Sequence, residues 1–92
     1  MRRKRPQPGH WYSVYMVAYV DEATRARVER GEEVITQPAQ ITAQSFYMGT
    51  RKQQADYAFA RAALSAMNNP LAYAVIMEQD LEVIIRVRVE RR

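Results

Sequence analysis

The sequence predicts an α+β fold, with a four-stranded, mainly antiparallel sheet in ββαββ order and one helix packed on one face. Two observations carry this prediction. Four segments are rich in β-branched and aromatic residues, and residues 51–67 repeat their small and apolar side chains at helical spacing. A chain of 92 residues, of which 48% are hydrophobic and 26% charged, has room for one modest core and therefore one domain.

The first strand is predicted over residues 11–20, where two faces alternate. One face contains Tyr12, Val14, Met16, Ala18 and Val20, and the other contains Trp11, Ser13, Tyr15, Val17 and Tyr19. Residues 21–33 are polar and are interpreted as a long connection. Asp21 is able to cap a short helix there, and a charged hairpin about Arg30 and Gly31 is the alternative.

An edge strand is expected over residues 39–48, because Pro38 precedes it and proline is tolerated at sheet edges. Thr50 and Gln53 have the spacing of a capping box, which predicts a helix over residues 51–67 that ends at Asn68-Asn69-Pro70. Its apolar stripe consists of Ala55, Ala58, Phe59, Ala62, Ala63, Ala66 and Met67. Phe59 is central in this stripe, and the alanines allow close approach to a sheet.

Two further strands are expected over residues 71–78 and 81–90, joined by a tight turn at Gln79-Asp80. The last strand has a complete apolar face made of Leu81, Val83, Ile85, Val87 and Val89. The helix is expected to cover one face of the resulting sheet.

Positive charge is concentrated at the two ends of the chain, which has a net charge of +4. Residues 1–9 contain two prolines and no apolar periodicity, so they are predicted to be a flexible basic arm before a single binding domain over residues 10–92. If the first and last strands are antiparallel neighbours, both ends form one patch for phosphates. The alternative is a pair of solvated tails. The cations concerned are Arg2, Arg3, Lys4, Arg5, Arg86, Arg88, Arg91 and Arg92.

Three aromatic residues, Trp11, Tyr15 and Tyr19, recur with period two on one face of the first strand. A strand displays such residues as a platform on which unpaired bases stack. The alternative is that this face packs against another copy of the protein or under the long connection.

The residue inventory argues against an enzyme. There is no cysteine, and the single histidine, His10, lies beside the basic arm without a serine-histidine-acid arrangement. No catalytic residue, metal site, cofactor or small-molecule substrate is predicted. The basic start and the apolar run after it lack a small-residue cleavage site, and no segment is long enough to span a membrane. A cytoplasmic protein without membrane partners is therefore expected.

The arm MRRKRPQPGH, the strand WYSVYMVAYV and the tail LEVIIRVRVERR are the features on which a resemblance rests. In general style, as a short, cysteine-free, single-domain chain without catalytic residues, the protein resembles phage-encoded anti-CRISPR inhibitors. The resemblance implies binding to a host CRISPR effector complex and contact with guide RNA through arginines.

We therefore expect a non-catalytic protein that binds a nucleic acid or a ribonucleoprotein assembly through its basic ends and its aromatic sheet face. The alternative is a protein-interaction module or homodimer that uses the open sheet face without nucleic-acid contact. Salt dependence separates the two, because phosphate contacts release counterions.

Overall fold

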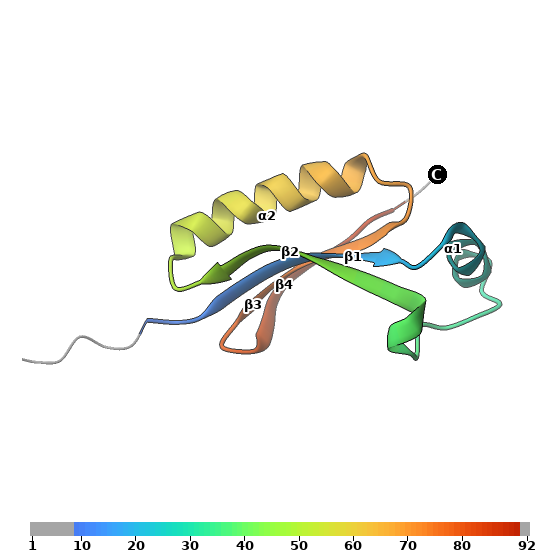
Figure 1. Ribbon diagram of the computed structural model, residues 1–92, viewed down its shortest axis with the longest axis horizontal. Helices are drawn as coiled ribbons and strands as arrows, with labels where there is room; N and C mark the ends of the chain where they lie inside the picture. The colour runs from blue at the N-terminus through green and yellow to red at the C-terminus, as the bar shows by residue number, and fades with distance from the viewer. Residues whose placement is uncertain (1–8, 91–92) are drawn as a thin grey trace, which may run out of the picture.

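The computed structural model describes residues 9–90, so all of the predicted arm except Gly9, together with Arg91 and Arg92, lies outside the described residues. The described chain contains four strands and two α-helices. They follow one another as β1 (Tyr12–Tyr19), α1 (Glu22–Glu29), the short 3₁₀ helix η1 (Pro38–Gln40), β2 (Ile41–Gly49), α2 (Lys52–Met67), β3 (Ala72–Gln79) and β4 (Glu82–Arg88). Figure 1 shows α2 lying along one face of the sheet, with α1 beyond the end of β1.

The α+β class and the four-stranded antiparallel sheet are confirmed, and the spatial order of the strands is β2-β1-β3-β4. β1 therefore lies at the centre, between β2 and β3. β4 pairs with β3 alone, so the expected pairing of the first strand with the last is wrong. A 16-residue α2 carries the chain across β1 before β3 begins, and this places β2 and β3 on opposite sides of β1.

The polar segment after β1 forms a helix, α1, that the ββαββ order omitted. The Asp21 side chain caps it by accepting a hydrogen bond from the Thr24 amide at 2.7 Å. Arg25 forms ion pairs with Glu22 and Glu29 on successive turns. Because these contacts are local and charged, the helix forms without the apolar stripe that would have identified it in the sequence.

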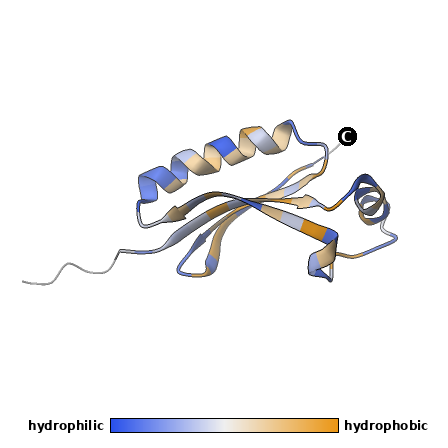
Figure 2. Cartoon of the chain, viewed as in Figure 1, coloured by the Kyte–Doolittle hydropathy of each residue, from blue (hydrophilic) through white to orange (hydrophobic). Residues whose placement is uncertain are grey.

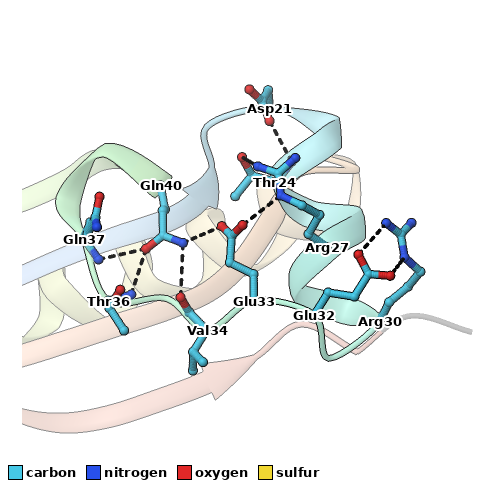
Figure 3. A network of polar contacts seen from close by, with 10 residues as sticks. All are labelled: Asp21, Thr24, Arg27, Arg30, Glu32, Glu33, Val34, Thr36, Gln37 and Gln40. Atoms are coloured by element: carbon cyan, nitrogen blue, oxygen red, sulfur yellow. Dashed lines mark hydrogen bonds and ion pairs between the residues drawn. The ribbon is translucent and has the colours of Figure 1, made fainter.

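A polar network joins α1 to the start of β2 (Figure 3). Glu33 accepts from the Arg27 guanidinium at 2.8 Å and from the Gln40 side-chain amide at 2.6 Å. The Gln40 side-chain oxygen in turn accepts from the amides of Thr36 and Gln37, both at 2.8 Å. The long connection thus packs against the sheet's end through hydrogen bonds.

The start of α2 differs from the expected capping box. Arg51 occupies the N-cap position without a side-chain cap, and its amide donates to the Tyr47 hydroxyl at 3.0 Å. Tyr47 comes from β2, so a tertiary contact replaces the local one expected from Thr50 and Gln53. Gly49 leaves room for this contact, since a Cβ atom added to it would lie 2.5 Å from the same hydroxyl and would displace the Tyr47 side chain.

The core lies between α2 and the central strands. Met77, Val14 and Val75 are its largest fully buried side chains. The helix contributes only alanines to the buried set, namely Ala55, Ala58, Ala62 and Ala66. Phe59 is half-buried and packs at the edge of this cluster, so it is less central than its position in the stripe indicated. The first turns of α2 are hydrophilic (Figure 2).

Candidate interaction surface

The helix covers only part of the sheet, because α2 packs on β1, β2 and β3 while every residue of β4 is exposed. A helix is about 10 Å wide, whereas four strands spaced about 4.8 Å apart span roughly 14 Å between their outer axes and more with side chains. One helix leaves an outer strand uncovered for this reason. Four residues of the apolar face predicted for the last strand therefore lie at the surface, namely Leu81, Val83, Ile85 and Val87, and Ile84 is exposed with them. Val89, the fifth, packs against the core.

The outer edge of β4 also presents backbone groups to solvent. The Val89 amide donates to the Tyr73 carbonyl at 2.9 Å, so the backbone groups of Val89 point toward β3. Backbone direction alternates along an antiparallel strand, which turns the amides and carbonyls of Arg86 and Arg88 outward. An exposed, apolar edge with outward-pointing backbone groups is a template for another strand.

A groove of about 640 Å³ lies between the C-terminal half of α2 and the end of β4. Ala63, Ala66 and Met67 form its helix side, and Val87 and Val89 form its strand side. These side chains are mainly apolar, so the groove suits apolar side chains of a chain placed beside β4.

At the other end of β4, Leu81 lies in the tight turn after β3 and is 84% exposed. Both turn residues have positive φ angles, 53° for Asp80 and 71° for Leu81. Glycine or asparagine is usual in such a turn, and a leucine in the left-handed region costs about 1 kcal/mol or more. The fold thus presents a large apolar side chain at a strained position where it makes little contact with its own domain.

The aromatic face of β1 is less open than expected. Trp11 is 44% exposed, but Tyr19 is only 4% exposed and packs edge-to-face on Tyr73, with ring centroids 5.4 Å apart. Tyr15 is half-buried and its hydroxyl donates to Glu78. Burial, assisted by the hydrogen bond and charge of Glu78, raises the pKa of Tyr15 to about 12. A continuous three-residue stacking platform is therefore not available.

The start of β1 and the end of β4 do not lie at one corner of the sheet. β1 and β4 are both antiparallel to β3 and hence parallel to each other, so Arg88 lies near the end of β1 and far from its start. Arg86 and Arg88 share the face opposite α2, where the Arg88 guanidinium lies 4.8 Å from the centre of the Tyr73 ring. The strand pairing from which the single phosphate patch was predicted is thus wrong, and the cations of residues 1–8 and 91–92 lie outside the described residues.

The start of β1 is fixed by Asp80 from the β3–β4 turn. The Asp80 carboxylate accepts from the Trp11 amide at 2.9 Å and lies 2.6 Å from Nδ1 of His10. The Trp11 amide, together with His10, lowers the pKa of Asp80. His10 thus makes a structural contact with Asp80 on the surface.

Within residues 9–90, no three His, Cys, Asp or Glu side chains are grouped so that they could hold a metal ion. No helix in the same stretch is long and apolar enough to cross a bilayer.

The sequence analysis did not identify the apolar residues of β4 as surface residues, although the sequence contains a signal for an edge strand. A single alanine-lined helix cannot cover four strands, and the strand that carries Arg86 and Arg88 contains more charged residues than any other predicted strand. That strand belongs at an edge.

No family model, curated protein or solved structure significantly matches this chain. We therefore infer function from the chain's own surfaces.

Proposed function

We propose that the chain is a non-catalytic protein-interaction module that binds an extended segment of another polypeptide along the outer edge of β4. The observation that carries the proposal is the exposure of this whole apolar strand at an unpaired sheet edge. In strand addition, backbone hydrogen bonds supply affinity and alternate side chains supply specificity. The outward groups of Arg86 and Arg88 suit the first role, and the groove beside Val87 suits the second.

The opposite edge of the sheet differs from β4 in chemistry. The exposed middle of β2 consists of Thr42, Ala43, Gln44 and Ser45, which are small or polar. Small and polar side chains offer little apolar area to an added strand, so the proposed binding is selective for β4.

Binding to a nucleic acid or a ribonucleoprotein assembly is a second proposal, and the resemblance to anti-CRISPR inhibitors belongs with it. Its support is the net charge of +4, the exposed Trp11 and the pair Arg86 and Arg88. It is weaker than the first proposal because Tyr19 is buried and the start of β1 lies far from the end of β4.

Peptide selection tests the first proposal. The wild-type chain is immobilised at low density, and random 12-residue peptides are selected on phage and then titrated as synthetic peptides. We expect apolar β-branched residues at alternate positions, and Val87→Lys should weaken binding about tenfold or more. Met48→Lys, on the exposed part of β2, is the matched control and should leave binding unchanged.

Selected peptides that bind Val87→Lys as tightly as the wild type would contradict the proposal. A single-stranded oligonucleotide is the second probe. If it binds more tightly than any peptide and weakens steeply with salt, the nucleic-acid proposal is favoured instead.

A further inference from the structure

We infer that the strand bound along β4 is the β4 of a second copy of this chain, which makes the protein a two-fold homodimer. This inference rests on the proposed function of β4 and names its partner. Pairing two β4 strands antiparallel joins two four-stranded sheets into one continuous sheet with both α2 helices on the same face. Three features of β4 and its flanks argue for self-pairing over an unrelated segment.

The first feature is charge. β4 begins with Glu82 and ends with Arg86 and Arg88, so antiparallel pairing of two copies brings the acidic start of each beside the basic end of the other. The register of β4 shifts at Ile84, so Glu82 lies on the α2 face whereas Arg86 and Arg88 lie on the opposite face. The attraction therefore acts between the acidic start and the basic end of the two strands, and it favours the antiparallel arrangement over the parallel one.

The second feature is shape. The apolar groove lies at the end of β4, beside Val87 and Val89, whereas Leu81 projects from the turn that precedes β4. When two β4 strands pair antiparallel, the turn that carries Leu81 of one copy lies near the end of β4 of the other, beside Val87 and Val89. The two-fold symmetry repeats this contact, so both exposed leucines meet an apolar groove.

The third feature is the backbone of Leu81. Its φ of 71° favours glycine, yet the position holds a large apolar residue that is 84% exposed within one copy. Strain at an exposed residue points to a role for the side chain outside its own domain. Contact with the groove of a second copy supplies that role.

Leu81→Gly separates the homodimer from a merely structural turn. Sedimentation equilibrium of the full chain should give twice the chain mass for the wild type. Leu81→Gly should raise the dimer dissociation constant about tenfold or more, since a large anchor side chain is lost from each half of the interface. The same variant relieves the left-handed strain, so the thermal midpoint at concentrations where the chain is monomeric should stay equal or rise. The control is Leu64→Ala, which replaces an exposed leucine on α2. Alanine is chosen there because glycine weakens helices.

A charge exchange tests the antiparallel arrangement. Glu82→Arg alone and Arg86→Glu with Arg88→Glu alone should each weaken self-association, because like charges then meet twice at the two-fold interface. Mixing the two variants should restore dimers that contain one chain of each kind, which native mass spectrometry resolves.

A wild-type chain that stays monomeric at millimolar concentration would overturn the homodimer. If that monomer still binds the selected peptides through β4, the proposed function stands without it. A dimer that neither Leu81→Gly nor the charge exchange affects would also overturn the inference, because the copies would then meet through another surface.

Discussion

The packing of α2 on the central strands predicts a large cost for Met77→Ala. Met77 is 0% exposed and lies between the helix alanines and the neighbouring strands. The substitution removes three heavy atoms beyond Cβ, which is about 2.5 kcal/mol at roughly 0.8 kcal/mol per methylene-sized group. The cavity left behind raises the expected loss to about 3–4 kcal/mol, within the range measured for buried Met→Ala changes.

Urea unfolding followed by circular dichroism measures this loss, at a chain concentration held constant because dimerisation adds to apparent stability. A domain of this size has a total stability of about 5–10 kcal/mol, so the variant should melt roughly 15 °C or more below the wild type. Met48→Ala is the matched control, also in a strand but 61% exposed, and should change stability by about 0.5 kcal/mol at most. A loss under about 1 kcal/mol for Met77→Ala, or equal losses for both variants, would refute the described packing.

Three other changes test separate parts of the fold. Gly49→Ala should cost about 1–3 kcal/mol in unfolding experiments, because its Cβ would lie 2.5 Å from the Tyr47 hydroxyl. Gly9→Ala is the control and should be nearly neutral, because the atom nearest to an added Cβ there is 3.8 Å away. The pKa of Tyr15, about 12 against an ordinary 10.0, means that its neutral phenol stabilises the fold below pH 10 and that this contribution is lost as pH rises toward 12. Glu78→Gln should lower that pKa in an absorbance titration but leave it raised, because burial is the larger cause. Phe59→Ala should cost about 2–3 kcal/mol, less than at a fully buried site, and a cost under about 1 kcal/mol would mean that the aromatic ring does not pack on the core.

The strands and the long helix could be predicted from the sequence because their signals are local. Period-two alternation identifies β1, and the alanine stripe that ends at Asn68 identifies α2 within one residue at each end. The short helix α1 was weakly signalled, since its only large apolar residue is Val28 and its stability comes from ion pairs and the Asp21 cap.

The order of the strands in space could not be predicted from those local signals. Pairing of β1 with β3 joins residues about sixty positions apart, and nothing in the alternation of either strand selects its neighbour. A stronger argument was available from burial. β1 is apolar on both faces at Met16, Val17 and Ala18, which is typical of a central strand, whereas Arg86 and Arg88 on β4 are typical of an edge.

The error in strand order also affected the prediction of the candidate site. Placing the last strand beside the first made the two basic ends appear to be one patch and made the apolar residues of β4 appear to be core. With β4 at the edge, the same residues become an apolar surface with a charge at each end, and Leu81 becomes the most exposed large hydrophobic residue described.

Amide hydrogen exchange at β4 tests the central claim most directly, because it reports whether the outward backbone groups pair. We predict that the amides of Arg86 and Arg88 exchange rapidly in dilute wild-type chain and slow down as concentration rises, in step with the mass measured by sedimentation. In Leu81→Gly they should remain fast over the same range. Rapid exchange of both amides at every concentration, in a chain that nevertheless associates, would contradict pairing along β4.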